Sequence, residues 1–180
     1  MLRIFIALIM SIAVGTVNAQ DKGYAGATWG SYKFDPDELF TSDPRAASIN
    51  LGYRFSESNS LEVRVGFSLG ARDESLDVLG TQVDVKFELE KYFSILYKPE
   101  YEINNVILYG LFGYTKSTFR ASAQDFNVDI TGTKKGPSYG LGIGYSTSKR
   151  MRVGLEYQEL INSSTYSVRG VNFTIQSFFR

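Results

Sequence analysis

Apolar and polar residues alternate with a period of two along most of the chain. In the clearest stretch, residues 83–103, Phe93 and Ile95 fall in one phase, while Lys86 and Lys98 fall in the other. Successive side chains of a strand point to opposite faces, whereas a helix would scatter the two sets around its circumference. The pattern therefore predicts an all-β protein.

Turn residues divide this alternation into eight predicted strands, at 23–34, 47–55, 61–70, 83–103, 106–119, 138–147, 151–161 and 167–179. The connections at 57–60, 103–105 and 148–150 are tight. The others are longer or more polar, at 35–45, 72–82, 120–137 and 162–166. Alternation of short and long connections along an even number of strands indicates an antiparallel up-and-down barrel, with hairpin turns at one rim and loops at the other.

The periodicity separates two faces but leaves open which of them points outward. A soluble lipocalin-like barrel would enclose the apolar set, and a membrane barrel would expose it to lipid. Glycines such as Gly52 and Gly142 share the polar phase, where the crowded interior of a narrow barrel favours small residues. Aromatic residues of the apolar phase gather near strand ends, as in the interfacial girdles of membrane barrels. We therefore expect a transmembrane barrel, with a soluble periplasmic lipid-binding barrel as the alternative.

The height of a tilted strand predicts which part leaves the membrane. An apolar band of about 25 Å takes about 10 residues of strand. Lys91 lies about 13 residues from the turn at Asn104, above that band. Residues 83–90 are therefore predicted to protrude beyond the membrane.

The amino-terminal segment has the features of an export signal. Arg3 precedes an apolar run from Ile4 to Val14, and Val17-Asn18-Ala19 offers small residues at a cleavage site. The run is shorter than the roughly 20 apolar residues of a spanning helix. We predict a signal peptide over residues 1–19, cleaved after Ala19, and a barrel over residues 20–180.

The composition argues against several classes of function. The formal net charge is zero, so the chain carries no basic excess for nucleic acid. Cysteine and histidine are both absent. Enzymatic outer-membrane barrels depend on a histidine as a general base, so we expect no enzyme and no cofactor or metal. A carboxylate pair such as Glu88 and Glu90 is better interpreted as structural charge.

The polar phase supplies both signs of charge, which we expect to form a paired network that fills the lumen, since unpaired buried charges are costly. Its predicted members are Arg54, Glu62, Arg64, Glu88, Glu90, Lys98, Arg152 and Glu156. Arg54 and Glu62 are expected to be near neighbours across the turn at 57–60. The rival hypothesis is an ion-conducting pore lined by the same charges.

The long loops offer candidate contacts for partners. Phe40 ends the acidic segment 35–40, and Arg120, Lys134 and Lys135 could meet lipopolysaccharide phosphates. Alternation at Phe126, Val128 and Ile130 predicts a further strand inside the third loop, and an exposed strand edge can add a partner's strand.

Four glycine- and aromatic-rich strands carry a family resemblance: Leu108–Tyr114, Tyr139–Tyr145, Met151–Tyr157 and Val171–Phe179. On these strands the chain resembles the small outer-membrane barrels of the OmpA-like and OmpX–opacity protein superfamily. The resemblance implies an outer-membrane location, contact with outer-membrane lipids and lipopolysaccharide, and a structural or adhesin-like role through the loops, with the host or surface ligand undefined. It also implies insertion by the barrel-assembly machinery, which recognises a terminal aromatic residue. This chain departs from the family in ending with Arg180 after Phe179.

Overall fold

The computed structural model describes residues 22–35, 44–70, 72–78, 81–123, 128–163 and 166–179. These residues form nine strands: β1 Gly23–Asp35, β2 Arg45–Ser56, β3 Asn59–Ser68, β4 Arg72–Val78, β5 Thr81–Ile103, β6 Val106–Ala123, β7 Val128–Ser146, β8 Met151–Ser163 and β9 Tyr166–Phe179. Within the described ranges we find no helix with the length and hydropathy needed to cross a membrane. The predicted signal peptide, its cleavage site, Phe40 and Phe126 lie outside the described residues.

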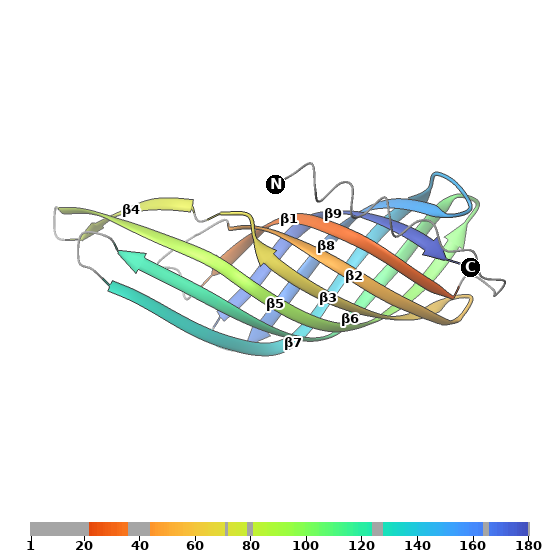
Figure 1. Ribbon diagram of the computed structural model, residues 1–180, viewed down its shortest axis with the longest axis horizontal. Coiled ribbons are helices and arrows are strands. Elements are labelled where there is room, and N and C mark those ends of the chain that lie inside the picture. The colour runs from red at the N-terminus through yellow and green to blue at the C-terminus, as the bar shows by residue number, and fades with distance from the viewer. Residues whose placement is uncertain are drawn as a thin grey trace.

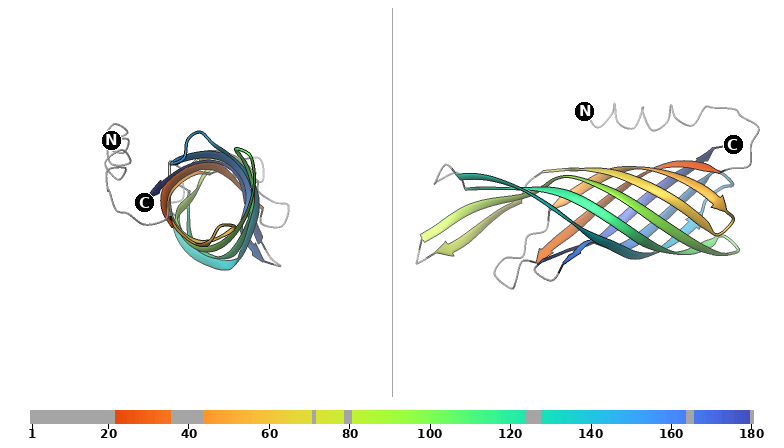
Figure 2. Two further views of the ribbon diagram at one scale, coloured as in Figure 1. Left: turned by 90° about the vertical axis from the view of Figure 1, so that its right-hand side faces the viewer. Right: turned by 90° about the horizontal axis from the view of Figure 1, so that it is seen from below.

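Eight of these strands close into a barrel. The sheet order is β3-β2-β1-β9-β8-β7-β6-β5-β4, and β3 also pairs with β5. Every pairing is antiparallel, and the end-on view in Figure 2 shows the closed ring. The predicted fold class is confirmed.

Three tight connections lie at one end of the barrel, which we call the turn end. They join β2 to β3, β5 to β6, and β7 to β8. In the two-residue turn between β5 and β6, Asn104 has a φ of 56°, a left-handed conformation that asparagine tolerates better than most residues. The pairing of Gly23 with Phe179 places the start of β1 and the end of β9 at this same end. The opposite rim is the loop end.

At the loop end, a sheet extends beyond the barrel. The β5–β6 and β6–β7 ladders continue to Ala123, whereas β8 pairs with β7 only from Tyr139 onward. β4 pairs with the first residues of β5, so that β4 to β7 form a four-stranded projection (Figure 1). The predicted segment 83–90 continues beyond the pairing of β5 with β3, which ends at Lys91. Residues 128–130 of the third long connection form the start of β7, as the alternation there predicts.

Two connections differ from the sequence-based expectation. Residues 72–82, expected to be a loop, contain β4 and the start of β5, because the alternation at Leu76 and Val78 continues the ladder. The connection expected over 162–166 is shorter, because β8 extends to Ser163 and β9 begins at Tyr166. Both differences extend strand pairing at the loop end.

The apolar phase faces outward and the polar phase faces the lumen. Leu51, Val65 and Ile143 are 59%, 53% and 49% exposed, whereas Arg64 and Glu156 are buried. The expected orientation of a membrane barrel is therefore confirmed.

Glycines on the inner wall make room for large lumen side chains. A Cβ at Gly52 would lie 2.0 Å from the Tyr24 ring, and a Cβ at Gly142 would lie 2.2 Å from the Tyr109 ring. The predicted crowding of the inner wall at glycine positions is confirmed, and the crowding comes from tyrosine rings.

Two β-bulges change the phase near the loop end. The register shifts between Leu89 and Lys91 in β5, and between Glu159 and Ile161 in β8. Each bulge adds one residue to its strand. Leu89 therefore points inward, although the alternation on the turn-end side of the bulge predicts a lipid-facing position for it. The same bulge removes Glu88 and Glu90 from the inward phase, and both are only half-buried.

Candidate functional site

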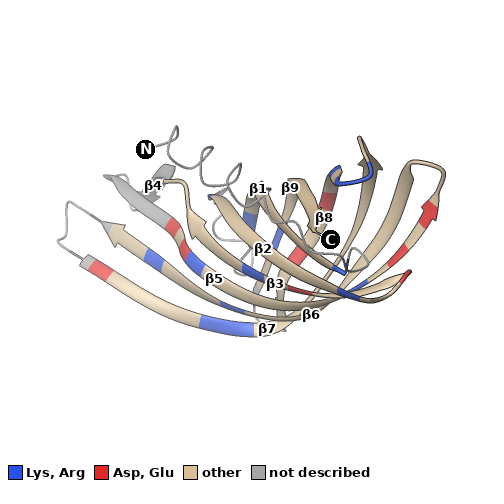
Figure 3. Ribbon diagram, turned by 45° about the vertical axis from the view of Figure 1, so that its right-hand side comes forward, with Lys and Arg blue, Asp and Glu red and all other residues tan. Residues whose placement is uncertain are grey.

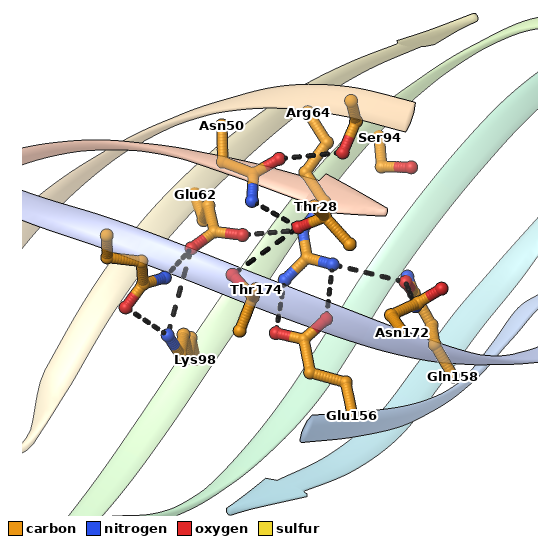
Figure 4. Close-up of polar contacts among 12 residues, drawn as sticks. Thr28, Asn50, Glu62, Arg64, Ser94, Lys98, Glu156, Gln158, Asn172 and Thr174 are labelled. Atoms are coloured by element: carbon orange, nitrogen blue, oxygen red, sulfur yellow. Dashed lines mark hydrogen bonds and ion pairs between the residues drawn. The ribbon is translucent and has the colours of Figure 1, made fainter. Parts of the chain in front are cut away.

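An ion cluster lies at the centre of the lumen (Figure 4). Arg64 of β3 donates through Nε to Glu62 Oε1 at 2.5 Å. Its Nη1 and Nη2 atoms donate to Glu156 of β8 at 2.7 and 2.9 Å. Tyr24 donates to the other oxygen of Glu62, Oε2, at 2.6 Å. Tyr109 donates to Glu156 Oε1, which also accepts from Arg64, at 3.0 Å. Both carboxylates therefore have a cation partner and a phenol donor.

Lys98 of β5 extends this cluster towards the turn end. Its Nζ lies 3.3 Å from Glu100 Oε1 and 3.9 Å from Glu62 Oε2, and it donates to Gln176 at 3.3 Å. The ammonium also lies 4.2 Å from the centroid of the Tyr109 ring, a cation–π distance. Lys98 thus connects the central carboxylates to a second cluster.

The second cluster lies at the turn end. Arg54 and Arg152 both donate to Glu100 Oε2, at 2.8 and 2.9 Å. Their guanidinium carbons lie 4.5 and 4.9 Å from the centroid of the Phe178 ring. Glu102, half-exposed at the rim, lies 3.7 Å from Arg152. One ring and one carboxylate oxygen therefore hold two guanidinium groups together.

Neutral polar groups lie on the loop-end side of the central cluster. Asn50 donates to Thr28 at 2.6 Å and accepts from Ser48 at 2.8 Å, and a 2.7 Å bond joins the hydroxyls of Ser94 and Thr115. None of these residues carries a formal charge. The charged part of the lumen thus gives way to hydroxyls and amides.

A layer of buried apolar side chains follows, nearer the loop end. Tyr92 lies two residues beyond Ser94 on β5, and Tyr32 lies four residues beyond Thr28 on β1. The layer consists of Tyr32, Ala46, Leu89, Tyr92, Phe119, Leu160, Ile161 and Val168. The two bulges supply Leu89 and Ile161. This apolar layer separates the ion clusters from the loop end.

The structure brings together six of the eight charged residues predicted for the lumen: Arg54, Glu62, Arg64, Lys98, Arg152 and Glu156. Glu88 and Glu90 lie outside the clusters, and Glu90 lies 3.6 Å from the exposed Lys91. Arg54 bonds to Glu100 rather than to Glu62, because it lies nearer the turn end than Glu62 does.

Sequence reasoning did not assign lumen roles to Tyr24, Tyr109 and Gln176. The alternation of β5 places Glu100 in the polar phase, but Glu100 was not among the predicted members of the network. The two tyrosines have no such signal, because tyrosines lie on both faces of this barrel, as buried Tyr92 and exposed Tyr97 show.

Basic residues of β5, β6 and β7 lie towards the loop end (Figure 3). Lys116 of β6 pairs with Lys135 of β7, which places both side chains on one face, and Phe93 of β5 is the other cross-strand neighbour of Lys116. Both lysines are exposed, as is Lys91. Lys134 of β7 is the cross-strand partner of Ser117 of β6. Outward positions nearer the turn end, such as Phe112 and Tyr114 of β6, are aromatic and exposed, so the apolar outer face ends at Lys91, Lys116 and Lys135.

Arg120, another predicted loop contact, lies farther out on β6. Its Nε donates to Asp129 Oδ1 of β7 at 3.1 Å, and both side chains are about half exposed. The ion pair offsets part of the positive charge there.

A family model for the outer membrane protein beta-barrel domain matches residues 4–176. The chain belongs to this family. It is therefore an outer-membrane barrel, and the expected family resemblance is confirmed. A search of curated protein sequences finds no significant match.

Solved structures of small outer-membrane barrels share the fold. The attachment invasion locus protein Ail of Yersinia pestis has a TM-score of 0.61 at 16% identity, with 89% of this chain and 100% of Ail covered. Neisserial surface protein A has a TM-score of 0.62 at 16% identity, with 87% and 97% covered. The barrel domain of Pseudomonas aeruginosa OprF has a TM-score of 0.61 at 8% identity, with 88% and 98% covered. At these identities the likeness establishes the fold alone.

Proposed function

We propose that this barrel has a structural and surface-interaction role, adhesin-like, through its loop end, and that it catalyses no reaction. One observation carries the proposal: strands β4 to β7 continue beyond the barrel as a paired sheet with exposed side chains such as Ile130. Strands that extend beyond the lipid-facing part of the barrel no longer line the lumen. A sheet in that position is available to molecules outside the cell.

Two features support a filled lumen over an ion-conducting pore. The charges of the clusters are paired across the lumen, as in the ion pair of Arg64 with Glu156. The apolar layer around Leu89 and Ile161 would impose a desolvation cost on any ion passing it. Planar-bilayer recording of the purified barrel tests this part of the proposal. We expect no stable single-channel steps, and reproducible steps would establish the pore instead.

The outer basic row, Lys91, Lys116 and Lys135, favours an anionic partner at the outer surface. We propose that its immediate partner is the phosphate of lipopolysaccharide, because lysine ammonium groups at headgroup height bind phosphates as point charges. Ail, which shares the fold, has been crystallised in complex with the heparin analogue sucrose octasulfate. That complex supports a polyanion as a second class of ligand for the loop end.

We also propose that the chain reaches this membrane through cleavage after Ala19 and insertion by the barrel-assembly machinery. Amino-terminal sequencing of the mature protein from isolated outer membranes tests the cleavage site. The expected first residue is Gln20. A different first residue would contradict cleavage after Ala19.

Binding by intact cells tests the surface role. In one variant, residues 72–82 are replaced by a short Gly-Ser turn, which removes β4 and the first two residues of β5, Thr81 and Gln82. In a matched control, the turn-end residues Glu57 and Ser58 are replaced by Asn-Gly. Binding to immobilised heparin or to host cells should fall for the first variant and persist for the second. Equal binding by both variants and the parent would refute a role for the projecting hairpin.

A further inference from the structure

A polar pocket opens at the turn end, opposite the proposed surface-interaction site. Its volume is about 350 Å³, and its lining includes Arg54, Arg152, Lys149, Ser146, Ser148 and Glu102. In outer-membrane barrels the short turns face the periplasm. The pocket therefore opens towards the periplasmic space and the inner-leaflet headgroups.

The lining of this pocket carries excess positive charge. Arg54, Arg152 and Lys149 are three cations, and Glu102 is the one carboxylate among the lining residues. Glu100 lies behind the lining and accepts from both arginines through a single oxygen, Oε2. Counting Glu100 as well, three cations face two carboxylates. An anion bound in the pocket would restore the balance.

The two arginines are held in place and incompletely paired. Arg152 is 5% exposed, and the Nε atoms of Arg54 and Arg152 have no hydrogen-bond partner within the described part of the chain. Packing against the Phe178 ring fixes both guanidinium planes. A buried donor without a partner is costly, so such groups point to a ligand or a functional role.

We propose that this pocket binds a phosphate group. Guanidinium forks match phosphate oxygens, and an ammonium and hydroxyls such as Ser148 supply donors from other directions. A tetrahedral anion uses donors arranged around it, whereas a planar carboxylate uses one fork. The phosphate belongs either to the headgroup of an anionic phospholipid in the inner leaflet or to a soluble phosphate ester in the periplasm.

The test is a titration followed by amide NMR. The full barrel is folded in lauryldimethylamine oxide micelles, which contain no phosphate, and titrated with glycerol phosphate at constant ionic strength. A second arm compares phosphatidylcholine nanodiscs with and without phosphatidylglycerol. We expect saturable shifts at the amides of residues 146–152 in at least one arm. Shifts in the micelle arm assign a soluble ester, and shifts confined to the phosphatidylglycerol nanodiscs assign a lipid headgroup.

Matched variants distinguish binding in the pocket from non-specific electrostatic attraction to the barrel. Lys149→Gln and Arg54→Gln should each raise the apparent Kd by about tenfold, the loss of one charge-assisted hydrogen bond. Arg150→Gln removes a neighbouring charge that does not line the pocket, and it should change the Kd by less than about twofold. Heat-modifiable gel migration verifies folding of each variant. Absence of saturable shifts in both arms, or equal weakening by Arg150→Gln, would overturn the proposal.

Discussion

Arg64 and Glu156 form a two-point ion pair across the lumen, with N–O distances of 2.7 and 2.9 Å and both side chains fully buried. Their strands, β3 and β8, are not neighbours, and the sheet order places them on opposite walls of the barrel. The pair therefore connects walls that no backbone ladder joins.

Removing one partner of this pair should strongly destabilise the barrel. Glu156→Gln leaves the Arg64 charge buried with only Glu62 as an anionic partner at hydrogen-bond distance, and breaking a buried pair costs about 3–5 kcal/mol. Reversible urea unfolding in phospholipid vesicles measures this loss. Glu90→Gln is the control, because Glu90 is half-exposed and should change the free energy of unfolding by less than about 0.5 kcal/mol. Similar losses for the two variants would contradict a special role for the central pair.

The bulge in β5 makes a second prediction. Because Leu89 packs in the apolar layer, Leu89→Ala should create a cavity and cost about 2–5 kcal/mol. Leu155→Ala truncates the same side chain on the lipid face, where lipid tails can fill the space, and should cost clearly less. The same unfolding assay compares the two. If Leu89→Ala were the milder variant, Leu89 would face lipid as the uninterrupted alternation predicts.

The sequence predicts most of the barrel because the alternation with a period of two repeats in every strand. On the turn-end side of the bulges, a shift of one residue would put apolar side chains in the lumen and charged side chains against lipid. Leu51 and Arg64 fall on the expected faces for this reason. A bulge depends on backbone geometry at one extra residue, and the consecutive charged residues Glu90 and Lys91 do not show whether a residue is inserted there. The positions of Glu88 and Glu90 were wrong for that reason.

The partners within the lumen were harder to predict than its members. Register between adjacent strands follows from the turns, but contacts across the lumen depend on side-chain length and on heights along non-adjacent strands. Arg54 reaches Glu100 of β5, and Arg64 reaches Glu156 of β8. Neither pair lies within a single hairpin, so the sequence of one hairpin does not predict it. The apolar layer was also missed, since its members come from six strands.

The fit of tyrosine rings over glycines makes a third prediction. A Cβ at Gly66 would lie 2.0 Å from the Tyr92 ring, so Gly66→Ala should displace that ring and cost about 1–3 kcal/mol. Gly132→Ala is the control, because a Cβ there meets nothing within 4 Å. Urea midpoints of both variants measure the difference. Equal midpoints would mean that the Tyr92 ring moves aside without cost.

The outer basic row makes the last prediction, which concerns lipopolysaccharide. Lys116 and Lys135 face each other across β6 and β7, and each basic residue near an anionic membrane surface contributes about 1 kcal/mol. The double variant Lys116→Gln/Lys135→Gln should therefore bind purified lipopolysaccharide at least about tenfold more weakly, measured by native gel shift of the folded barrel. Lys22→Gln/Arg150→Gln removes the same charge at the turn end and should leave the shift unchanged. Because net charge is equal in the two double variants, a difference between them locates the lipopolysaccharide contact at the loop end, whereas equal weakening would assign it to overall charge.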